Sequence, residues 1–162
     1  MTIIPSQKIY PCLWFDHQAE DAAKFYTSIF PNSRMGSITR YGEEAPLPAG
    51  TVLTVRFQIE GADFLGLNGG PHYTLSPAVS FVIGCDTQEE IDYYWEKLGA
   101  GGRYDQCGWL ADQFGVSWQV VPVMLVKLLE GGNGRKTGAM MGALMEMVKL
   151  DIATLQKAYD EG

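Results

Sequence analysis

Side chains able to carry out acid–base, nucleophilic or metal chemistry are few and widely spaced in this sequence. The 162-residue chain has two histidines, His17 and His72, and three cysteines, Cys12, Cys85 and Cys107. Neither histidine has a second histidine or a carboxylate at metal-ligand spacing, and there is no C-x-x-C or Cys–His pair. The sequence therefore predicts no thiolate zinc site, no disulfide framework and no activated cysteine nucleophile.

Taken one at a time, these histidines and cysteines are also weak candidates for a functional site, because none has a suitable partner nearby in the sequence. His17 falls in the first turn of a predicted helix, where a solvated side chain is expected, whereas His72 follows a Gly-Gly-Pro break and is kept as a ligand-contact candidate. Cys107 lies between Gln106 and Gly108 with no base nearby, so we expect an inert, buried thiol.

Composition limits the function classes further. Twelve Lys and Arg against nineteen Asp and Glu give a net charge of −7, which argues against nucleic acid or anionic lipid as a partner. A hydrophobic fraction of 46% with 19% charged residues is typical of a folded globular domain. No apolar run reaches the ~18 residues of a membrane span, and no secretory leader is visible, so a cytoplasmic protein is expected.

The first half of the chain predicts one helix among four strands. Residues 8–15 form an apolar strand, and Asp16 is the expected N-cap of a helix that ends at Pro31. A strand over 34–41 and a Pro- and Gly-rich loop over 42–50 follow. Residues 51–59 alternate apolar and polar, as a half-buried strand does, and Glu60-Gly61 reverses the chain into 64–67.

The second half repeats this order at an offset of 70 residues. A strand over 79–85 precedes a helix capped by Thr87 and Glu90, and strands are expected over 103–107, 109–113 and 116–121, with a turn at 112–115. Each half is thus predicted to be β-α-β-β-β. After Pro122, apolar stripes predict three helices, the last capped by Asp151. Five of the seven methionines lie in this tail, which either packs as an ordinary helical layer or meets a second subunit or a cavity.

Several stretches resemble one known family. They are Pro11–Asp16, the helix Gln18–Tyr26 with Ile29–Ser33, Phe64–Pro71, Gln106–Leu110, Gly115–Pro122 and Met147–Ile152. Together these are similar to PhnB-like proteins of the glyoxalase/bleomycin-resistance/extradiol-dioxygenase group, the vicinal oxygen chelate superfamily. Many members carry the label 3-demethylubiquinone-9 3-methyltransferase. The resemblance covers nearly the whole chain.

The resemblance implies paired β-α-β-β-β modules, sheets that curl around a cavity, and a homodimer, often with exchanged elements. Enzymes of the superfamily hold a divalent metal with His, Glu or Asp on four strands. Here the resemblance places Pro11, Asn68 or a neighbour, Ser80 and Gln119 at those positions. None of these is a usual metal ligand, so we expect no metal and no other cofactor.

The methyltransferase label is not supported by a nucleotide-binding motif. A Rossmann-type S-adenosylmethionine site needs a Gly-rich turn between the first strand and its helix, and residues 15–19 contain no glycine. Asn68, Ser80 and Gln119 form a neutral, hydrogen-bonding set that can orient a ligand but cannot act as a general base near pH 7. If Gln119 points into the cavity, Trp118 faces the helix layer.

The sequence therefore predicts an α+β fold. Paired modules occupy residues 1–122 (about 7–70 and 77–122), and a C-terminal helical extension occupies 123–162. The expected function is metal-free binding of a small, partly apolar molecule. The alternatives are an enzyme (a lyase, isomerase or transferase, including the labelled methyltransferase) and a structural or regulatory protein whose tail contacts another protein. The candidate ligand-binding residues are Asn68, Ser80, Gln119, Arg56, Trp14, Trp109 and His72. Whether Arg56 faces a cavity, and whether the aromatic residues are core or ligand platform, is left open.

Overall fold

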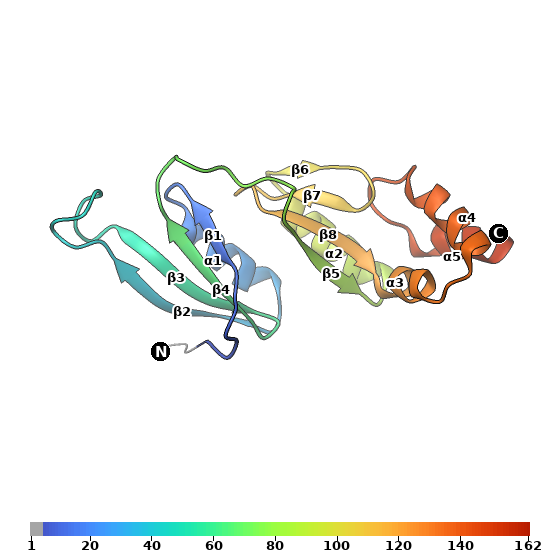
Figure 1. Cartoon of the computed structure of the whole chain (residues 1–162), viewed down its shortest axis with the longest axis horizontal. Coiled ribbons are helices and arrows are strands. Elements are labelled where there is room, and N and C mark those ends of the chain that lie inside the picture. Colours follow the sequence, from blue (N-terminus) through green and yellow to red (C-terminus); the bar gives the residue numbers. More distant parts are fainter. Residues whose placement is uncertain (1–4) are drawn as a thin grey trace. The chain divides into compact units, whose positions relative to one another are not determined.

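The computed structural model describes residues 5–162 as two compact units, one up to Leu75 and one from Ser76 to Gly162 (Figure 1). The first contains β1 (Cys12–Phe15), α1 (Ala19–Ile29), β2 (Ser33–Arg40), β3 (Val52–Ile59) and β4 (Ala62–Asn68). The second contains β5 (Ser80–Cys85), α2 (Gln88–Gly99), β6 (Arg103–Tyr104), β7 (Trp109–Ala111) and β8 (Ser117–Pro122), followed by three helices. The predicted α+β fold with a repeated β-α-β-β-β order is confirmed.

Both units also share one sheet topology. The strand orders are β1-β4-β3-β2 and β5-β8-β7-β6. In each sheet the first strand pairs in parallel with the fourth, and all other pairs are antiparallel. The helix after the first strand supplies the crossover that a parallel pair requires. The first strand of each unit, β1 or β5, therefore lies at an edge of its sheet.

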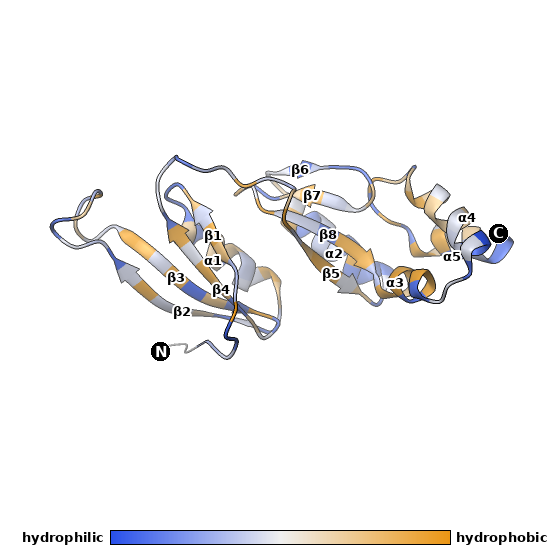
Figure 2. Ribbon diagram, in the orientation of Figure 1, coloured by the Kyte–Doolittle hydropathy of each residue, from blue (hydrophilic) through white to orange (hydrophobic). Residues whose placement is uncertain are grey.

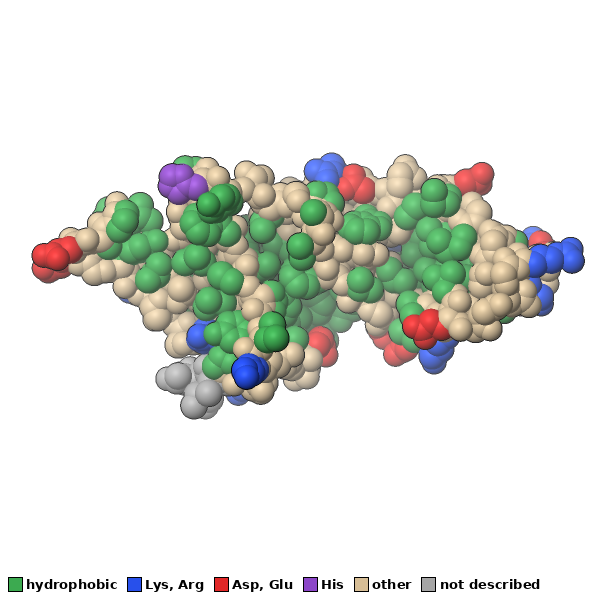
Figure 3. Space-filling model, in the orientation of Figure 1, with side chains coloured by type: hydrophobic (Ala, Val, Ile, Leu, Met, Phe, Trp, Pro, Cys, Tyr) green, Lys and Arg blue, Asp and Glu red, His purple; other side chains and the backbone are tan. Residues whose placement is uncertain are grey.

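In the first unit, α1 covers one face of the sheet. Along β3, Val55, Phe57 and Ile59 are buried, whereas the residues between them are half-buried. Figure 2 shows the matching alternation of hydropathy along this strand. Phe57 stacks on Tyr26 of α1, with the ring centroids 6.0 Å apart. A Cβ on Gly66 would touch Ala19, so the helix approaches β4 closely there. The opposite side is the open face of the first sheet, on which hydrophobic side chains lie over the strands in Figure 3.

In the second unit, the register shows which residues face α2. Phe81, Trp118, Leu110 and Tyr104 are successive partners across β5, β8, β7 and β6 and so share one face. Tyr104 stacks on Trp95 of α2, with the ring centroids 4.8 Å apart. This row therefore faces the helix, as predicted for Trp118. The alternate residues form the open face of the second sheet.

The starts of the two main helices differ from each other. Thr87 caps α2 as predicted, because its side chain accepts a hydrogen bond from the Glu90 N–H. The prediction that Asp16 caps α1 is wrong: the helix begins after Gln18 with no side-chain cap of its own. Asn68 of β4 instead accepts from the Ala19 N–H at 2.9 Å. A partner 49 residues away supplies the cap.

The predicted strand over 103–107 is also too long. β6 ends at Tyr104, and Cys107 and Gly108 take left-handed backbone angles, φ 62° and 81°. Two residues of this kind in succession turn the chain sharply and cannot continue a strand. The neighbouring predictions hold: Glu60 and Gly61 both have positive φ, as in a tight hairpin, and Gly115 N–H bonds to Asp112 C=O in the predicted turn.

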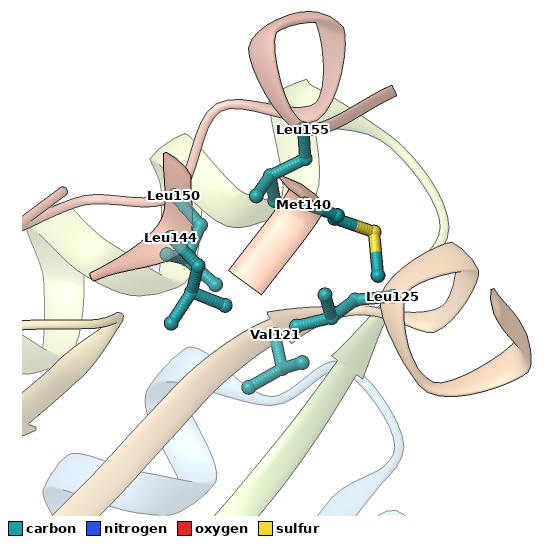
Figure 4. Close-up of a cluster of buried hydrophobic side chains, with 6 residues drawn as sticks. All are labelled: Val121, Leu125, Met140, Leu144, Leu150 and Leu155. Carbon is teal, nitrogen blue, oxygen red and sulfur yellow. The ribbon is translucent and has the colours of Figure 1, made fainter. Parts of the chain in front are cut away.

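The C-terminal extension belongs to the second unit and consists of α3 (Val123–Glu130), α4 (Gly134–Leu144) and α5 (Ile152–Glu161). α3 is mostly hydrophobic in Figure 2, with Lys127 and Glu130 as its charged residues. The three helices close over Val121 at the end of β8, and Figure 4 shows the cluster that results: Val121, Leu125, Met140, Leu144, Leu150 and Leu155. In residues 5–162 no helix has the length and hydrophobicity needed to cross a membrane.

Backbone hydrogen bonds tie this extension to the preceding sheet. Cys107 N–H donates to Met147 C=O and Gly108 N–H to Val148 C=O, both at 2.8 Å. The Gln88 side chain donates to Leu150 C=O at 3.1 Å and accepts from Ile152 N–H at 2.9 Å. The segment from Met147 to Ile152 is therefore held at both ends, and it fixes the turn that leads into β7.

Candidate functional site

The open face of the second sheet carries a polar pair among apolar neighbours. Gln119 Nε2 donates to Ser80 Oγ at 2.9 Å, and both residues are half-buried. Val82 of β5 and Trp109 of β7 are the register partners on either side of Gln119. Strand pairing therefore brings together Ser80, Gln119 and Trp109, although Ser80 and Gln119 are 39 residues apart in the chain.

This pair retains hydrogen-bonding capacity. Ser80 accepts from Gln119, so its own hydroxyl hydrogen points elsewhere, and Gln119 keeps a carbonyl oxygen and a second amide N–H. Trp109 adds an indole N–H and a flat apolar surface, and Val82 is 59% exposed. Such a surface can orient a small, partly apolar molecule that bears a carbonyl, hydroxyl or amide group.

The Trp14 side chain lies on the open face of the first sheet and is held in place by its contacts. Its indole Nε1 donates to Gly70 C=O at 2.9 Å, and the Tyr73 ring meets it edge-on with the centroids 4.9 Å apart. Glycine is required at position 69, because a Cβ there would overlap the Trp14 ring. Trp14 is thus held in one orientation and is half-buried rather than part of the core.

Arg56 lies on the same open face as Trp14. Its neighbours along the register are Leu65 of β4 and then Cys12 of β1. The Tyr10 ring lies against the guanidinium, 5.2 Å from Cζ to the ring centroid, and Arg56 Nη2 donates to the Tyr10 hydroxyl at 3.2 Å.

Other sequence candidates lie elsewhere. Asn68 shares the helix-facing side of β4 with Gly66 and is 2% exposed. Its oxygen accepts from Ala19 N–H and its nitrogen donates to Val52 C=O, so both ends of the amide are occupied. The outward-facing neighbour is Leu67. His72 is exposed in the loop after β4, and His17 is exposed as predicted.

The cysteines are not equivalent. Cys85 is fully buried, and desolvation together with the charges of Glu90 and Asp86 raises the pKa of its thiol to about 12. Cys107 is half-buried rather than buried as expected, and its sulfur lies 4.0 Å from that of Met145.

Asp63 of β4 is a buried carboxylate on the open face of the first sheet, and the sequence did not indicate it as a site residue. Asp63 accepts from Gln58 Nε2 at 2.7 Å, from Ser6 N–H at 2.7 Å, from Gln7 N–H at 3.0 Å and from the Ser6 hydroxyl at 3.0 Å. The side-chain bond from Gln58, followed by those from Gln7 and Ser6, lowers the pKa of this carboxyl. The carboxylate anchors the N-terminal segment, and no local pattern around Asp63 indicates these distant partners.

We expect Asp63 to make part of the stability of the protein depend on pH. Because its pKa is lower in the folded state, ionised Asp63 stabilises the fold above about pH 4, the usual pKa of an unfolded aspartate. This contribution is lost as the pH falls through the lowered value. Urea unfolding should therefore show that Asp63→Asn is less stable than the parent at pH 7 and that the difference shrinks below about pH 4. Glu44→Gln, in an exposed loop, is the matched control, and an equal pH profile for both variants would contradict the assignment.

The residues do not fit a divalent metal site. Within residues 5–162 no three His, Cys, Asp or Glu side chains lie close enough to hold an ion. At the positions that the resemblance assigns to metal ligands the chain has Pro11, Asn68 with its neighbour Leu67, Ser80 and Gln119. No carboxylate or imidazole is present at these positions, so they offer none of the side chains that usually bind a divalent metal ion.

Comparison with known proteins defines the family. A family model described as 3-demethylubiquinone-9 3-methyltransferase matches residues 7–121. The chain belongs to this PhnB-like family. A PhnB protein from Bacillus cereus that carries the same methyltransferase description is 38% identical, with 72% of this chain and 99% of that chain covered and a TM-score of 0.66.

A more distant structure supports the same fold. Protein PA1353 from Pseudomonas aeruginosa is 20% identical, with 72% of this chain and 98% of that chain covered and a TM-score of 0.59. A search of curated proteins found no significant match. The family match ends at residue 121, so the whole C-terminal extension of this PhnB-like chain, residues 123–162, lies beyond it.

Proposed function

We propose that this PhnB-like protein binds a small, partly apolar molecule on the open face of its second sheet, without a metal. The observation that carries the proposal is the Gln119–Ser80 hydrogen bond of 2.9 Å, flanked by Val82 and Trp109. Ser80 and Gln119 are neutral side chains at two of the positions where the family resemblance expects a His, Glu or Asp metal ligand. The remaining donors and acceptors would orient the ligand, and Trp109 would cover its apolar part.

Binding is supported over acid–base catalysis by the side chains on this face. Ser80, Ser117, Gln119 and Trp109 do not titrate near neutral pH, so none can serve as a general acid or base there. Asp63 lies in the other unit, and its hydrogen bonds hold it ionised by lowering its pKa. These properties favour sequestration of a ligand over its conversion.

Methyl transfer, which the family description names, finds no support in the loops. Gly69 and Gly70 follow β4, but no helix begins between β4 and β5, so this glycine-rich turn does not lead into the helix N-terminus of a Rossmann-type nucleotide site. The junction between β1 and α1, residues 16–18, contains no glycine.

A thermal-shift screen of metabolites and antibiotics tests the proposal, because a ligand that binds only the native state raises the melting temperature. For each compound that binds, calorimetric titration should show that Gln119→Ala weakens binding by roughly tenfold, the value of about one hydrogen bond. Ser80→Ala should weaken it by a smaller factor, since Gln119 remains.

Gln113→Ala is the matched control, since Gln113 is exposed in the turn between β7 and β8. Its affinity should equal that of the parent protein. Unchanged affinity in Gln119→Ala for every compound would contradict the proposal. The homodimer and the cytoplasmic setting expected from the sequence stay predictions, and light scattering checks the first.

A further inference from the structure

The first unit contains a half-buried cation with no acidic partner. Of the five arginines, Arg34, Arg40, Arg103 and Arg135 are exposed and Arg56 alone is half-buried. Arg103 is paired with Asp105 at 2.9 Å, whereas the contacts of Arg56 within residues 5–162 are to the neutral Tyr10. A guanidinium partly removed from water gains most from an anion, because charge-assisted hydrogen bonds replace its lost hydration.

The surroundings leave the donors of Arg56 usable. A guanidinium carries five N–H groups in a planar fork, and the Tyr10 hydroxyl takes one of them. The Tyr10 ring lies against the group and restricts its orientation. Arginine commonly stacks on an aromatic ring while its edge binds a carboxylate or phosphate in bidentate fashion.

On the side of Arg56 towards β4 and β1 the open face carries apolar residues, whereas Thr54 and Gln58 flank Arg56 along β3. Leu65 is the register partner of Arg56, and Leu67 and Trp14 pair in the adjacent row. All three are half-buried, and Trp14 is fixed by its bond to Gly70. Asp63 also lies on this face; its carboxylate accepts four hydrogen bonds, from Gln58, Ser6 and Gln7, and within residues 5–162 it forms no ion pair with Arg56.

We propose that the open face of the first sheet is a binding site for an organic oxyanion: Arg56 holds the anionic head group, and Leu65, Leu67 and Trp14 contact its apolar body. Carboxylates and phosphonates share the oxygen geometry that the guanidinium fork recognises. The site lies wholly within the first unit, so it stands independently of the Ser80–Gln119 pair.

The test uses the full chain with benzoate and phenylphosphonate as probes and benzyl alcohol as the neutral counterpart. The arginine Nε–H signals are followed by NMR. We expect a saturable shift of the Arg56 signal with at least one anion and none with benzyl alcohol. The anion that binds with the higher affinity, benzoate or phenylphosphonate, identifies the preferred head group. Arg56→Gln, followed through the Trp14 indole signal, should weaken binding roughly tenfold or more.

Arg34→Gln is the matched control, because Arg34 is exposed on the same sheet and bonds to the neutral Gln58. It should bind as the parent does. Tyr10→Phe keeps the ring and releases one N–H, so it should bind at least as well, which separates ligand binding from folding defects. Equal shifts at Arg34, Arg40 and Arg56, no saturation, or equal binding of benzyl alcohol would overturn the proposal. Unaltered binding in Gln119→Ala would leave it intact.

Discussion

Replacing Asp112 by alanine should lower the free energy of unfolding by about 3–5 kcal/mol. The carboxylate is 3% exposed and accepts from Phe114 N–H at 2.8 Å, Val116 N–H at 3.1 Å and the Trp118 indole at 2.9 Å. Its removal leaves three donors unsatisfied in a poorly solvated place, each costing about 1–3 kcal/mol. The expected loss is a large share of the roughly 5–15 kcal/mol of a typical domain. Urea unfolding followed by far-ultraviolet circular dichroism measures it.

Two variants make this prediction specific. Asp105→Ala removes an aspartate from the same unit, but one whose partner is the exposed Arg103, so the change in stability should be small. Asp112→Asn keeps one oxygen acceptor and places an amide N–H against the Trp118 indole donor, so it should fall between the parent and alanine. A stability of Asp112→Ala equal to that of Asp105→Ala would show that this carboxylate does not organise the β7–β8 turn.

Gly108→Ala should be the next most damaging substitution, with a loss of about 2–4 kcal/mol. Gly108 has φ 81°, a conformation that costs an L-residue about 1–2 kcal/mol. In addition, a Cβ would lie 2.9 Å from Leu150 Cγ and 3.0 Å from the Val120 carbonyl oxygen. Relief of this overlap requires Leu150, which is 1% exposed, to move away from the sheet. Urea unfolding gives the magnitude.

Hydrogen exchange shows where the damage lies. The amides of Cys107 and of residue 108 are protected by Met147 and Val148 in the parent and should exchange faster in Gly108→Ala. Gly138→Ala is the control, because Gly138 lies in α4 without a positive φ and an added Cβ would meet nothing within 4 Å. A helical Gly→Ala change should leave stability equal or slightly higher. Unchanged exchange at 107 and 108 would contradict the assigned role of Gly108.

Local patterns in the sequence predicted most of the fold. The apolar–polar alternation of 51–59 identifies β3 within one residue, since that pattern depends only on neighbours along the chain. Thr87 and Asp151 cap their helices as predicted, because each bonds an N–H three residues ahead. The start of α1 could not be predicted in this way, because its cap comes from Asn68 on a distant strand.

The candidate site was predicted only in part, for the same physical reason. Ser80 and Gln119 were recognised as a possible polar set, but their direct bond depends on the register of β5 and β8. Asn68 was grouped with them, yet its amide is used in holding α1 to the sheet. Asp63 and Asp112 resemble ordinary polar residues in the sequence, and only the folded chain shows that each gathers several donors.

The family match ends at residue 121, but Cys107 and Gly108 donate hydrogen bonds to Met147 and Val148. The part of the chain that folds as one unit therefore continues beyond the matched residues. A fragment ending at Pro122 would uncover Val121 and leave two main-chain amides without acceptors in a turn that precedes Trp109. The position of Trp109 on the open face of the second sheet therefore depends on residues that follow β8 in the chain, and it is fixed only when the helices after β8 have packed against the sheet.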